Sequence, residues 1–181
     1  MARTPSTMVE LGSIAPDFRL LDPATNQQVA RDELRKPKGL LVIFMCNHCP
    51  FVKHILDGLR ALGQDYRDSD IGLVAISSND VENYPEDAPE KMPELNLGIT
   101  YLYDETQEVA KAYDAACTPD FFLYDGNLKL VYRGQFDDSR PGNDIAVTGR
   151  DLRAAMDALL EGREISHNQT PSLGCNIKWK S

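Results

Sequence analysis

The chain has 181 residues, of which 42% are hydrophobic and 26% are charged, values that are ordinary for one globular domain with a buried core. Its 28 acidic side chains outnumber the 19 basic ones, and the net charge of -9 argues against nucleic acid or an anionic membrane surface as a partner. No run is long and apolar enough to span a membrane, and Met1 to Glu10 lacks the apolar stretch of a secretory signal. We therefore expect a cytoplasmic protein.

The first predicted elements form a β-hairpin near the N-terminus. Between Ala15 and Leu34 the sequence indicates a strand, a turn from Asp22 to Asn26, and a return strand near Gln28 to Ala30.

A continuous apolar run from Leu40 to Met45 then predicts a strand that is covered on both faces. From Pro50 the spacing becomes helical, with one apolar side formed by Phe51, Val52, Ile55, Leu56, Leu59 and Leu62. Gly72 to Ser77 predicts a second buried strand.

The segment from Ser78 to Gly98 is polar and contains three prolines, so we expect an excursion with one short helix. Thr100 to Tyr103 predicts a third strand. Glu105 to Ala115 predicts a helix whose inward side chains are Val109, Ala112 and Tyr113.

Phe121 to Tyr124 and Leu128 to Tyr132 flank an Asp-Gly-Asn turn, which is a strong hairpin signal. Arg150 to Leu160 predicts an amphipathic helix. This order of elements indicates an α/β fold with a central mixed β-sheet flanked by helices. We expect one domain over residues 14–162, followed by a C-terminal tail, residues 163–181, that packs on it or is extended.

The chemical signal lies at the junction between the first buried strand and its helix, where Cys46 and Cys49 stand three residues apart. The first N–H groups of a helix are unpaired and its dipole is positive there, which favours a thiolate. Cys117 and Cys175 stand alone, so the four cysteines do not form a disulfide framework. The junction indicates redox chemistry.

The start of the helix decides which thiol attacks. Proline is favoured at the first helical position, and Pro50 there makes Cys49 the capping residue, with Cys49 as attacker and Cys46 as resolver. In the alternative register the helix begins at Cys46. A protonated His48 would further stabilise the Cys49 thiolate. His54 and His167 are expected to be solvated.

Other interpretations of the cysteines stay open. Cys46 and Cys49 can bind zinc together with His48, Cys117 or Cys175, or can be an inert buried pair; we expect neither a metal nor a cofactor. Cys117 is either an accessory thiol that exchanges with Cys49 or a packed thiol. Cys175 has no predicted partner, and we do not expect it to serve as a second resolving thiol.

Four segments carry a family resemblance: Ala15 to Phe18, Phe44 to Pro50, Thr118 to Phe121, and Gly149 with Arg150. They resemble the thioredoxin fold, and within it the redoxins, which include the peroxiredoxins of the AhpC/TSA family and thioredoxin-like disulfide reductases. The resemblance covers about Ile14 to Leu160. It implies a cis bond before Pro119 and a Thr118 backbone that binds an extended substrate segment.

Two positions depart from these families. The peroxiredoxin threonine is replaced by Cys46, and the second thioredoxin cysteine by Val52 when Cys49 attacks. Either register predicts a Cys46–Cys49 disulfide, and we expect a thiol-disulfide oxidoreductase. The alternatives are a thiol peroxidase, with Arg133 or Arg150 stabilising an anion, and a non-enzymatic zinc-binding or redox-sensing module.

The expected partners are a disulfide or hydroperoxide substrate, either a protein or a small molecule, and an external thiol donor. Nucleic acid and membranes are not expected. The oligomeric state is open, with a homodimer as one option.

Overall fold

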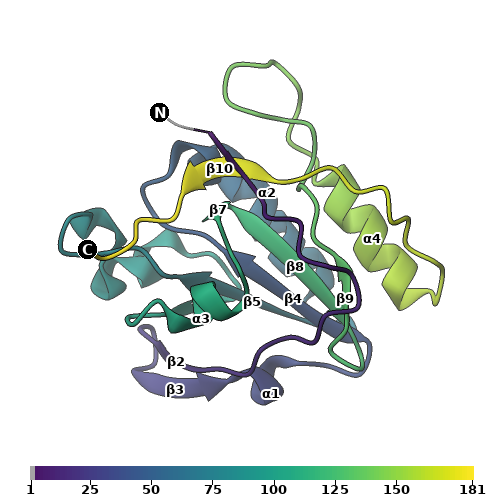
Figure 1. The fold of residues 1–181 in the computed structure, drawn as a ribbon, viewed down its shortest axis with the longest axis horizontal. Helices are drawn as coiled ribbons and strands as arrows, with labels where there is room; N and C mark the ends of the chain where they lie inside the picture. Colours follow the sequence, from purple (N-terminus) through teal and green to yellow (C-terminus); the bar gives the residue numbers. More distant parts are fainter. Residues whose placement is uncertain (1–2) are drawn as a thin grey trace.

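The central feature of the computed structural model, which describes residues 3–181, is a mixed β-sheet with helices on both faces (Figure 1). One group of strands has the order β3 (Gln27–Ala30), β2 (Arg19–Asp22), β6 (Thr100–Tyr103) and β5 (Ile71–Ser77). The other has the order β4 (Gly39–Phe44), β8 (Asp120–Asp125) and β9 (Leu130–Tyr132). The two groups adjoin where β5 lies beside β4, and there the N–H of Met45 donates to the carbonyl oxygen of Ile76 at 2.9 Å. β5 pairs with β6 in parallel, whereas the pairs β2–β3, β2–β6, β4–β8 and β8–β9 are antiparallel.

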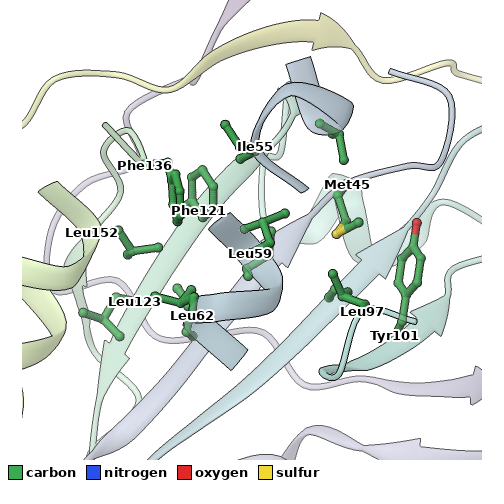
Figure 2. Packing of buried hydrophobic residues seen from close by; sticks show 14 of the residues in the cluster. Met45, Ile55, Leu59, Leu62, Leu97, Tyr101, Phe121, Leu123, Phe136 and Leu152 are labelled. Atoms are coloured by element: carbon green, nitrogen blue, oxygen red, sulfur yellow. The ribbon is translucent and has the colours of Figure 1, made fainter. Parts of the chain in front are cut away.

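All six residues of β4 are buried, which explains why its sequence is apolar without alternation. On one face, Leu41 and Ile43 pack with α2 (Pro50–Tyr66) and α4 (Arg150–Leu160), the cluster drawn in Figure 2. On the other face, Leu40, Val42 and Phe44 pack with residues of and beside α3 (Glu108–Ala112). Burial of each such side chain contributes about 1.5–3 kcal/mol to the free energy of unfolding. The two clusters therefore fix the position of β4 and of the cysteines that follow it.

Helix α2 begins at Pro50, with Cys49 as its capping residue in an extended conformation. The register with proline at the first helical position is therefore confirmed, and the register that starts the helix at Cys46 is wrong. The physical reason is that proline lacks an N–H, and at the first position of a helix an N–H would have no partner within the helix. The predicted apolar side of α2 faces the core, with Leu56 only half-buried.

Most other predicted elements are confirmed. The N-terminal hairpin pairs β2 with β3 antiparallel, and β8 and β9 form the hairpin around the Asp-Gly-Asn turn. A short helix, α1 (Arg31–Leu34), follows β3. The polar excursion holds two short 3-10 helices in place of one, η1 (Pro85–Asp87) and η2 (Pro89–Leu95), each opened by a proline.

The helix predicted from Glu105 to Ala115 is shorter than expected. Gln107 has a left-handed backbone, with a φ of 67°, so regular α-helix begins only after it and spans α3. Ala112 is exposed and Val109 half-buried, whereas Ala110 faces the core. The inward position assigned to Ala112 was therefore wrong.

Residues 163–181 return across the domain from the end of α4 to the thiol region. Their strand β10 (Leu173–Asn176) pairs antiparallel with β7 (Cys117–Thr118) on one side and with β1 (Thr4–Pro5) on the other (Figure 1). This small sheet joins both terminal regions over the N-terminal end of α2. Within residues 3–181, no helix has the length and apolar character that a membrane crossing requires.

Candidate active site

The two thiols of the junction share one neighbour, Thr118. The sulfur of Cys49 lies 3.3 Å from the Thr118 carbonyl oxygen, to which its thiol donates, and the sulfur of Cys46 lies 3.7 Å from the Thr118 hydroxyl oxygen. The Thr118–Pro119 peptide bond is cis, as the resemblance implied. Both cysteines are fully buried, and no disulfide joins any of the four cysteines, all of which lie in the described part of the chain. The fold thus brings Cys46, Cys49, Thr118 and Pro119 together.

The two cysteines have opposite acid–base properties. Hydrogen bonding from the Cys46 thiol lowers the pKa of Cys49 against the effect of burial, and the Cys175 thiol, Thr118 and the Val52 backbone act in the same direction. Hydrogen bonding to Cys49 raises the pKa of Cys46, as do burial and the charge of Asp87. A thiolate is therefore favoured on Cys49 over Cys46.

A buried acid that sequence reasoning missed lies beside this pair. Asp87, at the end of η1, has no exposed surface and accepts hydrogen bonds from the backbone N–H groups of Asn47 (2.7 Å) and His48 (3.0 Å). Its other oxygen accepts from the Asn79 amide (3.0 Å) and lies 2.5 Å from Nδ1 of His48. Asp87 therefore holds the loop between the two cysteines. Its position after a proline in a polar excursion carried no signal of burial.

His48 lies beside Cys46, with Nδ1 3.9 Å from the Cys46 sulfur. The polar contacts of the His48 ring are with Cys46 and Asp87, and its support of a Cys49 thiolate stays a prediction. The ring of His48 stacks on Tyr84 with centroids 5.3 Å apart. Ligand atoms of Cys46, His48 and Asp87 lie within 4.8 Å of one another, so the zinc interpretation has three donors here, none of them Cys117 or Cys175.

The hydrogen bond of the Cys117 thiol is to a backbone carbonyl and not to Cys46 or Cys49. This thiol donates to the Pro119 carbonyl oxygen at 3.5 Å, and burial followed by the nearby Asp120 carboxylate raises its pKa far above the ordinary value. Of its two sequence interpretations, the geometry fits the packed thiol.

Cys175, for which no partner was expected, lies against Cys49. Its backbone pairs with Thr118 across β10 and β7, Thr118 contacts the Cys49 sulfur, and both cysteines belong to one buried cluster. Burial and hydrogen bonding to Cys49 raise the pKa of Cys175 to about 12. Sequence reasoning missed it because a four-residue strand with glycine and asparagine has no strand signal of its own.

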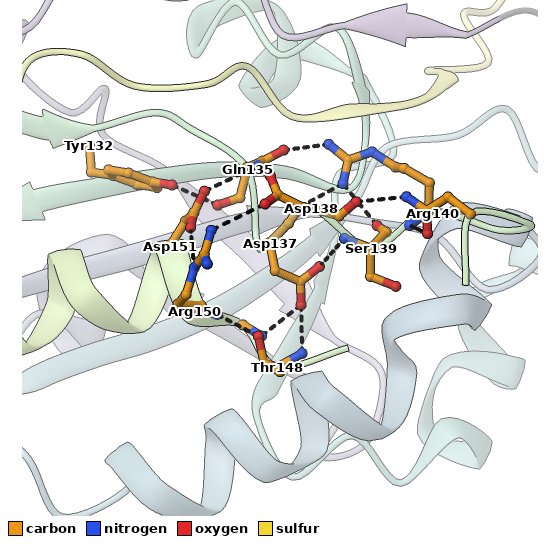
Figure 3. Close-up of polar contacts among 11 residues, drawn as sticks. Tyr132, Gln135, Asp137, Asp138, Ser139, Arg140, Thr148, Arg150 and Asp151 are labelled. Carbon is orange, nitrogen blue, oxygen red and sulfur yellow. Dashed lines mark hydrogen bonds and ion pairs between the residues drawn. The ribbon is translucent and has the colours of Figure 1, made fainter. Parts of the chain in front are cut away.

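The two arginines considered as anion-stabilising groups are engaged elsewhere. Arg133 donates to the Val9 carbonyl oxygen (2.9 Å) and to Gln169 (2.9 Å). Arg150 pairs with Asp138 (3.1 Å) and Asp151 (3.3 Å) at an exposed edge of the loop before α4, shown in Figure 3. Neither guanidinium has a contact with the thiols among the described residues.

His54 is not solvated as expected. It is half-buried on α2, and its Nε2 lies 2.7 Å from the Ser139 hydroxyl oxygen. The reason is that the loop before α4 folds over the polar side of α2 at this point. His167 is exposed.

Comparison with known proteins agrees with this architecture. The chain is similar to an uncharacterized conserved protein from Geobacillus kaustophilus, at 53% identity and a TM-score of 0.97 over 99% of this chain and 97% of that one. A hypothetical protein from Sinorhizobium meliloti is similar at 47% identity and a TM-score of 0.95, over 98% and 99% of the two chains.

A more distant solved structure is the thioredoxin domain of a thiol-disulfide oxidoreductase from Bacteroides vulgatus, at 20% identity and a TM-score of 0.61 over 81% of this chain and 97% of that one. This likeness shows the thioredoxin-like fold. No curated protein matches the chain. The AhpC/TSA family profile matches residues 11–133, which is more than half of the sequence. The chain therefore belongs to the AhpC/TSA family and has a thioredoxin-like fold.

Proposed function

We propose that this protein is a thiol-disulfide oxidoreductase in which Cys49 attacks and Cys46 resolves. The observation that carries the proposal is the placement of both thiols against Thr118 at the start of α2, at 3.3 Å for Cys49 and 3.7 Å for Cys46. Hydrogen bonding within this pair lowers the pKa of Cys49 and raises that of Cys46. One thiol is therefore ionised for attack while the other keeps its proton until it is needed. The family supports redox chemistry of this kind.

The reaction proceeds in two exchanges. The Cys49 thiolate attacks one sulfur of a substrate disulfide, a new S–S bond forms, and the other substrate sulfur leaves as a thiolate. Cys46 then loses its proton and attacks the Cys49 sulfur, which releases the second substrate thiolate and leaves a Cys46–Cys49 disulfide. Two electrons pass from the protein dithiol to the substrate. An external thiol donor restores the dithiol.

The proton of Cys46 needs an acceptor in the second exchange, because its thiolate is disfavoured by burial. His48 is 3.9 Å from this sulfur and is held by Asp87 at 2.5 Å. We assign the His48–Asp87 pair as the route by which this proton leaves. The exchange step is otherwise carried by the three sulfur atoms alone.

A thiol peroxidase is the second candidate, and the family together with the lowered pKa of Cys49 favours it. In that reaction Cys49 attacks a peroxide oxygen, water or an alcohol leaves, and Cys46 condenses with the sulfenic acid to the same disulfide. It is less well supported because Arg133 and Arg150 are bound elsewhere and Cys46 replaces the threonine hydroxyl.

One experiment separates these functions. Reduced protein is mixed with oxidised glutathione or with hydrogen peroxide, and thiol loss is followed beside Cys49→Ser and a Cys117→Ser control. We expect Cys49-dependent formation of the Cys46–Cys49 disulfide from glutathione disulfide, at least about tenfold faster than for an ordinary thiol, with Cys117→Ser unchanged. Peroxide should react no faster than with an ordinary thiol.

Faster, Cys49-dependent loss with peroxide than with glutathione disulfide would favour the peroxidase. Lack of reaction with both, together with stoichiometric zinc that protects the thiols from titration, would favour the non-enzymatic binding module and end the proposal.

A further inference from the structure

The tail segment β10 occupies the backbone edge beside the cis-proline. Cys175 pairs with Thr118, Asn176 pairs with Cys117, and the Ser172 hydroxyl donates to the Pro119 carbonyl oxygen at 2.6 Å. This is the edge at which the family resemblance implied binding of an extended substrate segment. In this protein the chain supplies that segment itself, and the segment carries a cysteine.

The cysteine is directed at the reacting atom. Cys175 pairs with Thr118, the Thr118 carbonyl oxygen lies 3.3 Å from the Cys49 sulfur, and both cysteines belong to the same buried cluster. Hydrogen bonding to Cys46 and then to Cys175 lowers the pKa of Cys49. The attacking sulfur therefore has two further thiols near it, Cys46 from the loop after β4 and Cys175 from β10. Because Cys175 and Cys49 both adjoin Thr118, a modest approach brings their sulfur atoms within exchange distance.

Several contacts hold the tail in this position. Beyond β10, the backbone N–H of Lys178 donates to the Asn79 side chain (2.9 Å) and that of Lys180 to the Gln107 side chain (2.9 Å). Both amide side chains are buried, and Asn79 also donates to Asp87. Lys178 is thus anchored through its backbone, by way of Asn79, to the Asp87 carboxylate that holds the Cys46–Cys49 loop, and Lys180 is anchored to Gln107.

Gly174 makes this close approach feasible. A Cβ atom at this position would overlap the Thr118 carbonyl oxygen, which is backbone and cannot rotate away. The absence of a side chain therefore lets β10 lie flat on β7, and this brings Cys175 over Cys49. The same contact offers a way to displace Cys175 without removing any thiol.

We infer that Cys175 is a second resolving thiol of the exchange reaction, delivered to Cys49 by strand pairing of the tail with β7. The inference rests on the proposed function. After Cys49 has formed a mixed disulfide, Cys175 attacks the Cys49 sulfur, the substrate sulfur leaves and takes up the Cys175 proton, and a Cys49–Cys175 disulfide forms. Cys46 then attacks Cys49, which gives the Cys46–Cys49 disulfide and returns Cys175 to a thiol. Electrons balance, because each step exchanges one S–S bond for another.

The test uses the full chain with Cys46→Ser, oxidised glutathione as the probe, and mass mapping of disulfide-linked peptides. We expect Cys46→Ser to lose its glutathione adduct and to form a Cys49–Cys175 disulfide. In Cys46→Ser/Cys175→Ser the adduct on Cys49 should persist at least about tenfold longer, because the intramolecular thiol is gone. Cys46→Ser/Cys117→Ser, which removes the neighbouring packed thiol, should behave like Cys46→Ser.

A second variant, Cys46→Ser/Gly174→Ala, keeps Cys175 but displaces β10, so its glutathione adduct should also persist. The matched control is Cys46→Ser/Asn176→Ala, on the exposed side of the same strand, whose adduct should be lost as fast as in Cys46→Ser. Equal adduct lifetimes with and without Cys175 would overturn the inference and leave the exchange function intact. If Cys49 forms neither an adduct nor a disulfide in any variant, the proposed function fails, and the inference fails with it.

Discussion

Two buried aspartates, Asp87 near the thiols and Asp137 in the loop before α4, both have carboxylates removed from water, and each is compensated by a different set of hydrogen-bond donors. Asp137 accepts three backbone N–H groups, from Ser139 (2.9 Å), Thr148 (2.7 Å) and Gly149 (2.7 Å), as Figure 3 shows. Asp87 accepts two backbone N–H groups and two side-chain groups, one of which is the imidazole of His48.

The difference lies in what the donors can do. Backbone amides cannot change protonation state, so the Asp137 cluster only fixes a loop. The His48 ring can exchange a proton and lies next to the Cys46 sulfur, so the Asp87 cluster connects a buried charge to the thiol chemistry. A buried carboxylate whose oxygens are all hydrogen-bonded is thus structural when its donors are backbone amides. It can take part in chemistry when one of its donors is a titratable side chain.

The largest expected effect is on the structural cluster. Asp137→Ala leaves three buried N–H groups without an acceptor and should lower the free energy of unfolding by about 3–5 kcal/mol, measured in urea. Asp138→Ala, at an exposed ion pair in the same loop, should cost less than about 1 kcal/mol. Cys49 alkylation in the folded Asp137→Ala protein should be unchanged; a changed rate would show that the two regions are not separate.

A third buried carboxylate, Asp120, sharpens the comparison because it has few donors. Its Oδ2 accepts from the Ala116 N–H at 3.1 Å, its Oδ1 has no hydrogen-bond partner among residues 3–181, and burial raises its pKa from 3.8 to about 6. Because the pKa of Asp120 is higher in the folded protein than in the unfolded chain, protonated Asp120 contributes fully to stability below about pH 4. This contribution is lost as the pH rises through about 6.

Relative to Asp120→Asn, the unmodified protein should therefore lose about 2–3 kcal/mol of unfolding free energy between pH 4 and 6. Urea unfolding of both proteins across this range measures the difference. A constant difference between the two proteins would contradict the raised pKa.

The smallest effect on stability is expected at the functional cluster. In Asp87→Asn the amide oxygen still accepts the two backbone N–H groups, and His48 can accept from the new NH2 by changing tautomer. The Asn79 amide loses its acceptor, so the unfolding free energy should fall by about 1–2 kcal/mol. The chemistry should change more.

The Asp87 charge is one of the causes that raise the pKa of Cys46, after its hydrogen bond to Cys49 and burial. In a Cys49→Ser background, Asp87→Asn should therefore speed Cys46 alkylation at neutral pH by up to about tenfold. Asp137→Asn in the same background is the control. An unchanged alkylation rate would mean that the Asp87 charge does not reach Cys46.

The parts of the site that lie on local sequence signals could be predicted. The apolar run of β4 and the proline at position 50 determine the strand end, the helix start and the cap at Cys49. Thr118 and Pro119 followed from the family resemblance. These features depend on residues adjacent in the sequence, which is why periodicity and proline geometry suffice for them.

The parts that depend on distant pairing could not be predicted. Asp87 reaches His48 from 39 residues away in a 3-10 helix, and no pattern in that polar segment marks one acid as buried. The partner of β10 is β7, more than fifty residues earlier, and its four residues gain their strand conformation from that pairing. The shortened α3 depends on one left-handed residue, Gln107.

The anchored tail also has an optical consequence. Trp179 is the single tryptophan of the chain, lies four residues after Cys175, and has Lys111 of α3 5.8 Å from its ring centroid at 42% exposure. Its emission therefore reports one event, the separation of the tail from α3, with no background from other indoles. Movement of the segment that covers Cys49 can be timed by fluorescence in the native sequence, without a label.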